Sequence, residues 1–269
     1  MSKYSKYWHV IQIGIQNTLV YRFNFFFRAA FSLVPLLATI YLWQTVYQGQ
    51  KSNIGNYTLA GMISYYLLVT IVDTLTAVNE DDWQIAAEIK DGNISQFLIK
   101  PIDYLAYRLC LFFSGKIIFT SVSMVPVGLF LFFYRHYLVA PPSGTALGCC
   151  LVSLFLTGLL QFFMSYTLAL LAFWLLEVST IIFILFAFEY IAGGHLFPLN
   201  ILPPGLERVL DLTPFPYQLF FPVSIYLGQS TGRALWQGMA IQAAWVLFFY
   251  LLAQGVWRRG IRTYTAVGG

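Results

Sequence analysis

Apolar stretches of about bilayer length dominate this chain, and they constrain its fold more than any other feature. They cover residues 25–47, 57–78, 105–133, 145–176, 179–197 and 234–257. A helix needs about 20 apolar residues to cross the hydrocarbon core of a membrane. Because every backbone polar group in lipid must be satisfied within the chain, these stretches are expected to be helices. The sequence predicts an all-α, polytopic membrane protein with six transmembrane helices.

The composition excludes a soluble globular protein. Charged residues make up only 10% of the 269 residues, hydrophobic residues make up 59%, and the mean hydropathy is +0.70. A soluble domain carries about 25% charged residues, which it needs to cover its surface. The basic residues are dispersed along the chain, so no nucleic-acid partner is expected. We expect one membrane domain, which extends over residues 1–269 and lies in the lipid bilayer.

Residues 1–23 have the pattern of an interfacial helix, which lies in the headgroup plane of a membrane. Six aromatic or apolar residues recur there at helical spacing, namely Tyr4, Tyr7, Trp8, Ile11, Ile15 and Leu19. Such a helix buries its apolar face at the boundary between headgroups and acyl chains. The alternative is an ordinary soluble helix that caps the bundle.

Residues 198–233 hold six of the chain's 11 prolines, interleaved with leucine, isoleucine and phenylalanine. Proline prevents long helices, and the apolar side chains keep the segment out of bulk water. Short, broken helices that re-enter one face of the bilayer before the last span fit both properties. The alternative is a disordered loop, but disordered segments are poor in aromatic residues.

The distribution of lysine and arginine predicts the orientation of the spans. Six spans place both termini on one side of the membrane, together with the loop of residues 79–104. Ten basic residues lie on or close to that side, and four lie on the other. Loops with an excess of basic residues stay in the cytoplasm. We therefore expect a multi-pass protein of a bacterial plasma (inner) membrane, with both termini cytoplasmic and the proline-rich segment extracytoplasmic.

Residues 79–104 form the longest polar segment between two spans, and their interior has the pattern of a short amphipathic helix. Its apolar face is expected to consist of Trp83, Ala86, Ala87, Ile94, Phe97 and Leu98. Gly92 interrupts the run and lets the chain turn. The pattern indicates a docking site for a soluble partner. The alternative is a loop helix that docks on its own helix bundle.

The layout and one local motif resemble type-2 ABC transporter permeases, the transmembrane subunits of ABC exporters. Residues 88–94 read EIKDGNI and residues 97–102 read FLIKPI. This is similar to the pattern E-I-x-x-G-x-[IL] followed by L-L-x-[KR]-P-[IL], which comes after the second span in that family. The layout matches over essentially the whole chain, including the interfacial helix and the re-entrant helices before the last span.

This resemblance implies a coupling role for the loop of residues 79–104. In such permeases the loop carries a coupling helix, which sits in a groove of a separate ATPase subunit. The role would belong to Glu88, Ile89, Gly92, Ile94, Phe97 and Pro101, with Ile94 and Phe97 as apolar anchors in the groove. The resemblance also implies a second permease half, either identical or homologous, because one half encloses no complete pathway.

No motif for nucleotide hydrolysis occurs in the sequence. A P-loop reads G-x-x-x-x-G-K-[ST], whereas the pair Gly115-Lys116 is followed by Ile117 within an apolar stretch. The histidines and cysteines show neither metal-ligand spacing nor a hydrolase set. We expect no catalytic, cofactor-binding or metal-binding residue in this chain, which would not be an enzyme. ATP and magnesium would bind to the partner ATPase subunit.

Three ionisable residues within the apolar stretches are candidates for function: Asp73, Lys116 and Glu189. A charge at the centre of a bilayer costs about 2.5–3.5 kcal/mol on insertion scales, so it faces the bundle interior or a cavity. Glu189 fits either a structural ion pair or a substrate pathway. The candidate pathway or gate residues are Glu189, Gly193, Gly194 and His195. For Asp73 and Lys116, which are nearer the cytoplasmic ends of their spans, a structural role is favoured.

The sequence favours the transmembrane permease subunit of an ATP-driven ABC exporter. Such a subunit forms half of the translocation pathway and couples to a separate ATPase subunit. The alternative is a secondary transporter or a non-transporting membrane scaffold subunit. Secondary transporters usually contain internal repeats, and no repeat relates residues 1–133 to residues 134–269. Neither the substrate nor the choice between a homodimer and a heterodimer follows from the residues.

Overall fold

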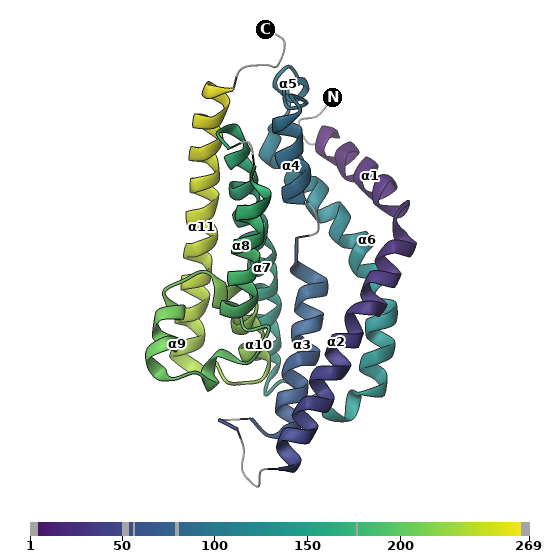
Figure 1. Ribbon diagram of the computed structural model, residues 1–269, viewed down its shortest axis with the longest axis vertical. Coiled ribbons are helices and arrows are strands. Elements are labelled where there is room, and N and C mark those ends of the chain that lie inside the picture. The colour runs from purple at the N-terminus through teal and green to yellow at the C-terminus, as the bar shows by residue number, and fades with distance from the viewer. Residues whose placement is uncertain (1–4, 50–53, 56, 79–80, 176, 265–269) are drawn as a thin grey trace.

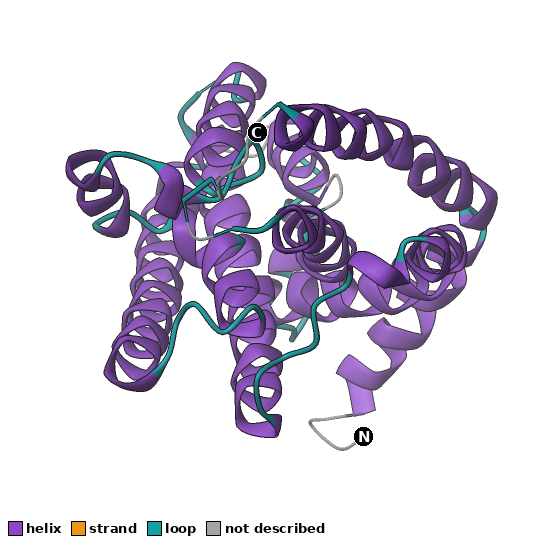
Figure 2. Ribbon diagram, turned by 90° about the horizontal axis from the view of Figure 1, so that it is seen from below, coloured by secondary structure: helices purple, strands orange, loops and turns teal. Residues whose placement is uncertain are grey.

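The computed structural model describes residues 5–49, 54–55, 57–78, 81–175 and 177–264, and over these ranges it consists of helices and loops without a strand (Figures 1 and 2). The α-helices are α1 (Ser5–Leu19), α2 (Arg22–Gln48), α3 (Leu59–Thr76), α4 (Asp81–Lys90), α5 (Ser95–Leu98), α6 (Tyr104–Phe133), α7 (Gly144–Ala169), α8 (Ser179–Ala192), α9 (Pro204–Asp211), α10 (Phe220–Tyr226) and α11 (Gly232–Thr263). Four 3-10 helices join them, namely η1 (Arg135–Tyr137), η2 (Leu170–Phe173), η3 (Leu199–Ile201) and η4 (Phe215–Gln218). The predicted all-α fold is confirmed.

Polar residues between the apolar stretches define where three of the long helices begin. Thr58, Asp103 and Ser143 precede α3, α6 and α7, and the side-chain oxygen of each accepts the backbone N–H three residues later. The first turn of a helix leaves N–H groups without intrahelical partners, and such a cap stabilises the helix by about 1 kcal/mol. The apolar runs therefore begin as helices immediately after these polar residues.

Helix α3 is the centre of the bundle. It packs against α2, α6, α7 and α10, and 61% of its most apolar window is buried, compared with 22% for α2 and 11% for α11. In lipid, helices associate through close packing rather than through the hydrophobic effect. The outer helices therefore present their apolar faces outward, and α3 holds the bundle together.

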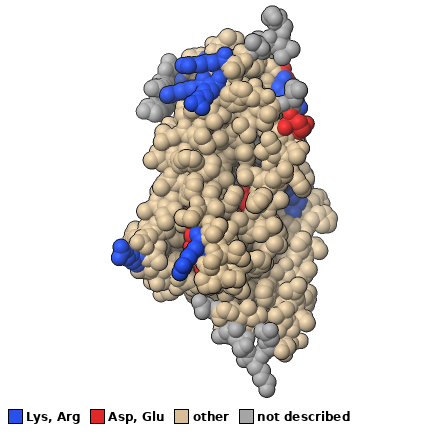
Figure 3. Space-filling view, turned by 60° about the vertical axis from the view of Figure 1, so that its left-hand side comes forward, with Lys and Arg blue, Asp and Glu red and all other residues tan. Residues whose placement is uncertain are grey.

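The loop that carries α4 and α5 lies at one end of the molecule, together with α1 and the C-terminal end of α11, and we call this the α4–α5 end (Figure 1). Two hydrogen bonds connect them: Lys6 donates to the carbonyl of Pro101, and the hydroxyl of Tyr264 donates to the carbonyl of Gly92 at 3.1 Å. Figure 3 shows basic side chains near this end and further charged side chains near the other end; the belt between them is mostly uncharged, with single acidic and basic side chains visible in it. Belts of this kind suit lipid, whereas the side of the membrane that the α4–α5 end faces stays a prediction.

Among the described residues, five helical segments are long and apolar enough to cross a membrane: α2, α3, α6, α7 with η2, and α11. Helix α8 is shorter, with 14 residues, and at 1.5 Å per residue it extends about 21 Å, less than a hydrocarbon core of about 30 Å. It ends at Ala192, where Gly193 and Gly194 follow, and not at Phe197 as predicted. A sixth crossing therefore stays a prediction.

The prolines divide residues 198–233 into the short elements η3, α9, η4 and α10, none longer than eight residues. Helix α10 is buried against α7 and α3, with Val223 and Ile225 at most 1% exposed. Helix α9 exposes Leu206, Val209 and Leu212 on its surface. Short, broken helices are thus present as predicted, and their depth in the bilayer stays a prediction.

Candidate functional site

A turn at Gly92 reverses the chain between α4 and α5. Gly92 has a φ of +77°, in the left-handed region that glycine adopts without steric cost. Its N–H donates to the carbonyl of Ile89 at 3.3 Å, and the N–H of Ile94 donates to the carbonyl of Glu88 at 3.0 Å. These bonds satisfy carbonyls at the end of α4, as a glycine C-cap does. Helix α5 then follows at Ser95.

A buried ion pair joins α4 to the membrane helix α6. The side chain of Arg108 is 2% exposed and pairs with Oε2 of Glu88, whose side chain is 27% exposed. The hydroxyl of Tyr104 donates to the same oxygen at 2.7 Å and accepts a hydrogen bond from Nε of Arg108 at 3.0 Å. The two charges compensate each other in a site with little water. Glu88 therefore holds α4 on the protein's own bundle.

The buried side of α4 and of the turn after it is not the predicted apolar face, because Trp83 and Ala87 are exposed. Ile85, Ile89 and Ile94 are 1%, 3% and 0% exposed. They pack with residues of α6, α7 and α11 in one core cluster. The expectation that Ile94 anchors in a partner's groove is therefore corrected, because its side chain fills the core of this chain. The alternative interpretation, a loop helix docked on its own bundle, applies to this face.

Apolar surface that remains for a partner lies at Trp83 of α4, which is 46% exposed, and on α5 and directly after it. Leu98 is 48% exposed and Ile99 is 86% exposed. Phe97 is half-buried, and its ring centroid lies 4.9 Å from that of Tyr107 and 5.3 Å from that of Tyr104. Phe97 thus connects α5 to α6, while Leu98 and Ile99 present apolar surface outward. Ile99 was not among the predicted coupling residues.

Aromatic rings extend this contact from α6 to α11. The ring of Tyr104 stacks on that of Trp257 in α11, with centroids 4.9 Å apart and planes at 11°. Phe173 of η2 lies edge-on to both Trp257 and Tyr264. Aromatic pairs of this geometry add about 0.5–1.5 kcal/mol beyond the area that they bury. Phe97 and Tyr104 thus connect α5 with the two long helices α6 and α11.

Three of the sequence candidates, Asp73, Glu189 and His195, line one cavity of about 410 Å³ between α2, α3, α7 and α8. Arg28 of α2 lines the same cavity. Two carboxylates, a guanidinium and an imidazole thus share a space within the bundle. This agrees with the rule that ionisable groups in membrane proteins face a cavity or one another.

His195 and Asp73 join the end of α8 to α3. Nε2 of His195 lies 3.2 Å from Oδ1 of Asp73, and the ring of Tyr190 stacks on the imidazole with centroids 4.8 Å apart. The side chains of His195 and Asp73 are 15% and 35% exposed. Asp73 therefore contacts His195 and also lines the cavity, and a structural role for it stays a prediction.

Four buried polar atoms without a hydrogen-bond partner among the described residues belong to side chains of this cavity. They are Oε1 of Gln161, Oγ of Ser165, Nδ1 of His195 and Oε1 of Gln218. A buried polar atom that lacks a partner costs about 1–3 kcal/mol. Such a cost is tolerated where a polar ligand can supply the missing bonds. Sequence patterns had not identified the two glutamines, because each sits among apolar residues of its own element.

Gly193 and Gly194 form the turn behind the cavity and do not line it. Gly194 has a φ of +99°, and its carbonyl accepts the hydroxyl of Tyr65 at 2.6 Å. The carbonyl of Leu196 accepts the hydroxyl of Tyr66, also at 2.6 Å. The two tyrosines thus fasten this turn to α3. A gate role for the two glycines stays a prediction.

Lys116, the third intramembrane charge, lies apart from this cavity. Its side chain is on α6 and is 8% exposed, and Nζ lies 5.0 Å from the centroid of the Phe119 ring. It lines a second cavity, beside α1. Among the side chains that the structure describes, no group of three or more His, Cys, Asp and Glu residues could hold a metal ion.

The chain was compared with protein families, with curated proteins and with solved structures. Residues 33–268 match the family model described as ABC-2 family transporter protein. The comparison with curated proteins found no match, and neither did the comparison with solved structures. The matched range begins within α2 and includes α4, α5, α11 and the residues that line the cavity, except Arg28 and Ser32.

Proposed function

Since this chain belongs to the ABC-2 transporter family, and is thus a membrane permease of an ABC transporter, we propose that it couples to a separate ATPase subunit through α4 and α5. The observation that supports this role is the division of the α4–α5 segment into two faces. One face is bound to the bundle through Ile85, Ile89 and Ile94, and the other exposes Leu98 and Ile99. Exposed apolar side chains on a polar segment favour a protein partner.

Force from the partner would reach the membrane helices through contacts already formed. A push on Ile99 displaces α5, which is linked to α6 through Phe97 and to α4 through the turn at Gly92. The Glu88–Arg108 pair and the Tyr104–Trp257 stack then act on α6 and α11. A small displacement of the exposed helix α5 would therefore move the two long helices α6 and α11.

The cavity between α2, α3, α7 and α8 would be this half's share of the translocation pathway. Its ionisable groups and its four unpartnered polar atoms suit a substrate with polar groups. Helix α8 has only Ile182 and Ala192 buried, and it exposes Phe183, Phe186 and Phe188 by 62% or more. We propose that a second permease half, identical or homologous, covers this face and completes the pathway.

The remaining parts of the proposal follow the type-2 permeases that the chain resembles. Transport would be export across a bacterial plasma (inner) membrane, with the α4–α5 end in the cytoplasm. ATP and magnesium would bind to the ATPase subunit, and this chain would bind neither. The excess of lysine and arginine expected on the side of the α4–α5 end agrees with that orientation.

Site-directed crosslinking tests the docking surface. Cys110, Cys149 and Cys150 are free thiols, so they are first replaced by alanine or serine. A cysteine at Gln96, exposed on α5, should form a crosslink to the co-expressed ABC ATPase subunit. A matched cysteine at Arg135, exposed on η1 at the other end, should form none. If Gln96 forms no crosslink in a complex that transports, the α4–α5 segment is not the docking site.

A further inference from the structure

Two glutamines that line the cavity around Asp73 and Glu189 are buried and lack a partner for their amide oxygens. Gln161 of α7 is 6% exposed and Gln218 of η4 is 1% exposed. Neither Oε1 accepts a hydrogen bond from the part of the chain that the structure describes, and Oγ of Ser165 has no partner there either. A buried polar atom without a bond costs free energy. A ligand in the cavity that donates hydrogen bonds would recover it.

A third buried glutamine, Gln242 of α11, shows the contacts of a structural role in this bundle. Its side chain is 0% exposed. Oε1 accepts a hydrogen bond from Oγ of Ser153 in α7 at 2.9 Å, and Nε2 donates to the carbonyl of Tyr217 in η4 at 2.8 Å. Both ends of this amide therefore join neighbouring elements. The two cavity glutamines differ, because their oxygens join nothing within the described chain.

The amide of Gln218 is oriented by its neighbours. The carbonyl of the preceding residue, Tyr217, is held by Gln242, and Nε2 of Gln218 donates to Sδ of Met164 in α7. A thioether sulfur accepts hydrogen bonds and donates none, so the nitrogen faces the sulfur and the oxygen is left over. The terminal torsion of a glutamine is soft. A rotation about it brings the oxygen to a ligand in the cavity that Gln218 and Met164 both line.

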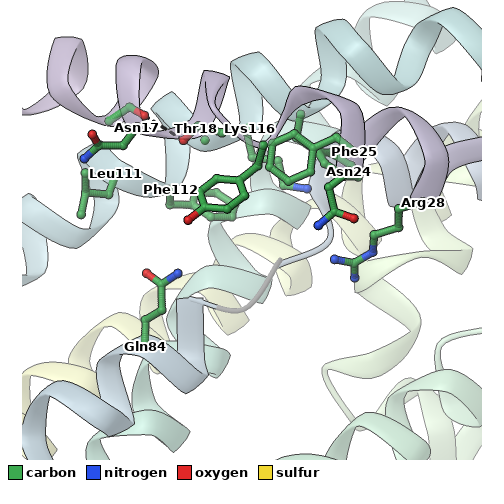
Figure 4. Close-up of a pocket in the computed structure, with 13 residues that line it drawn as sticks. Asn17, Thr18, Asn24, Phe25, Arg28, Gln84, Leu111, Phe112 and Lys116 are labelled. Carbon is green, nitrogen blue, oxygen red and sulfur yellow. Dashed lines mark hydrogen bonds between the residues drawn. The ribbon is translucent and has the colours of Figure 1, made fainter. Parts of the chain in front are cut away.

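The amides of the second cavity, beside α1, are in a different situation. This cavity has a volume of about 390 Å³ and is lined by Asn17, Asn24 and Gln84, among others. Figure 4 shows Asn24 of α2 and Gln84 of α4 on opposite sides of it. All three residues are exposed, so water can satisfy their amides. The amide oxygens of the two cavity glutamines are covered by protein, so bulk water does not satisfy them.

Helix α8 supplies an apolar part of the wall of the cavity around Asp73 and Glu189. Ile182, Leu185 and Phe186 line it, at the spacing of one helix face. The volume of about 410 Å³ lies within the range of small-molecule sites, about 300–1,000 Å³. A ligand that fits both sides has an apolar body against α8 and hydrogen-bond donors toward α7 and η4.

The charged side chains of the cavity are not needed for this recognition. Asp73 lies 3.2 Å from Nε2 of His195, and Arg28 and Glu189 also have interactions within the chain. The groups that lack a partner are instead neutral oxygens. The feature that they select in a ligand is therefore a donor, either a hydroxyl or an N–H group.

We propose, on the basis of the pathway role proposed for this cavity, that Gln161 and Gln218 determine specificity for a substrate with several hydroxyl or N–H donors beside an apolar body. The donors bind to Oε1 of the two glutamines, and the apolar body packs against α8. An analogue of the same shape without donors leaves both oxygens buried and unbonded, so the cavity rejects it.

Binding of small amphiphiles to the full-length protein in lipid nanodiscs tests the proposal, with equilibrium dialysis against protein-free nanodiscs as the background. Hexyl glucoside is compared with its tetra-O-methyl ether, and hexylammonium with hexyltrimethylammonium. The second member of each pair keeps the alkyl chain and the charge but lacks donors. The protein should bind the donor-bearing member of at least one pair tenfold or more tightly. The pair that shows this preference identifies the donor as a hydroxyl or an ammonium group.

Substitution by methionine, which keeps the length of glutamine and removes the amide, tests the residues. Gln161→Met and Gln218→Met should each weaken binding of the preferred probe by about tenfold. Gln161→Met should not lower the melting temperature, because the oxygen that it removes has no partner. Gln242→Met should lower the melting temperature. Gln16→Met, at an exposed glutamine of α1, is the matched control and should change neither quantity.

Three outcomes would overturn the proposal. The first is no binding of either donor-bearing probe up to millimolar concentration, and the second is equal binding of both members of both pairs. The third is undiminished binding by the two cavity variants, with Gln218→Met deciding if Gln161→Met does not fold. These measurements need neither the ATPase subunit nor transport. Their failure would leave the coupling role intact, and a failed crosslink at Gln96 would leave the binding result intact.

Discussion

The same side chain occupies opposite environments at positions 94 and 99. Ile94 is 0% exposed and Ile99 is 86% exposed, only five residues further along. An apolar residue in a polar loop is equally well explained by burial in its own bundle or by burial in a partner. The exposure of each side chain therefore shows its use as a probe: a substitution at Ile94 tests folding, and one at Ile99 tests docking.

Aspartate should impair stability at position 94 and binding of the ATPase subunit at position 99. Ile94→Asp places a charge in the core around Phe112 and Phe162, so the protein should lose thermal stability and yield in detergent. Ile99→Asp should leave melting unchanged and reduce co-purification with the ATPase subunit by tenfold or more, about 1.4 kcal/mol. Thermal melting and affinity pull-down together separate the two effects. Normal docking by Ile99→Asp would exclude this surface.

The Glu88–Arg108 pair should be a source of stability that depends on both partners. Glu88→Gln leaves the guanidinium of Arg108, 2% exposed, without its carboxylate. Loss of one partner of a buried pair costs about 3–5 kcal/mol, and the lower figure applies here because Glu88 is partly exposed. The melting temperature in detergent should fall accordingly.

A double variant supplies the control for this pair. Glu88→Gln combined with Arg108→Met removes both charges, so it should recover part of the stability lost by Glu88→Gln alone. If Glu88→Gln melts like the unsubstituted protein, the pair does not fasten α4 to α6.

At the scale of elements, α8 differs from the other membrane helices. It is short, most of its surface is exposed, and it contributes Glu189 and Tyr190 to the cavity. Because α8 makes few contacts within this chain, its position would depend on contacts with the proposed second permease half. Function and assembly are therefore expected to be sensitive to α8, and the stability of the single chain much less so.

Glu189→Gln distinguishes a pathway residue from a structural one. If Glu189 serves the pathway, the variant should fold and assemble normally while transport, or the stimulation of ATP hydrolysis by substrate, changes severalfold. A structural ion pair would instead show itself as a lower melting temperature and yield. Normal transport with normal melting would assign Glu189 to neither role.

The sequence predicted the membrane helices better than it predicted the contacts between them. The apolar runs identified the membrane helices because a bilayer imposes length and composition locally. The end of α8 was placed too late, although Gly193, Gly194 and Pro198 already marked a break in the sequence. The Asp73–His195 contact joins residues 122 positions apart, and no local pattern shows which two spans will face each other.

For the same reason the cavities could not be predicted as cavities. Lys116 and Arg28 each read as an isolated charge in an apolar run, and only the packing of α1 and α2 on α6 brings them together. Gln161 and Gln218 gave no signal, since a single glutamine in a helix is common. The motif around Gly92 predicted the turn. It could not show that Ile94 is buried by α6, α7 and α11 of the same chain, because that depends on tertiary packing.

At the scale of the whole molecule, the orientation in the membrane is open to a direct test. A cysteine at Arg208 on α9 should react with a membrane-impermeant maleimide in intact cells, and one at Lys90 on α4 should react only after the membrane is opened. Both residues are exposed in the structure, so access depends on the side of the membrane. Labelling of Lys90 from outside would reverse the topology and exclude docking of a cytoplasmic ATPase at the α4–α5 end.

The burial of α3 limits how proteins of this architecture can diversify. A helix with 61% of its apolar window enclosed by four neighbours tolerates few changes of side-chain volume, because a core substitution leaves a cavity or a clash. Helices α2 and α8 also line the cavity that holds Asp73 and Glu189, and they are largely exposed. In a saturation mutagenesis library, α3 outside Asp73 should therefore accept the fewest variants. Relatives that acquire new substrates would do so by drift in α2 and α8, around an α3 that stays almost unchanged.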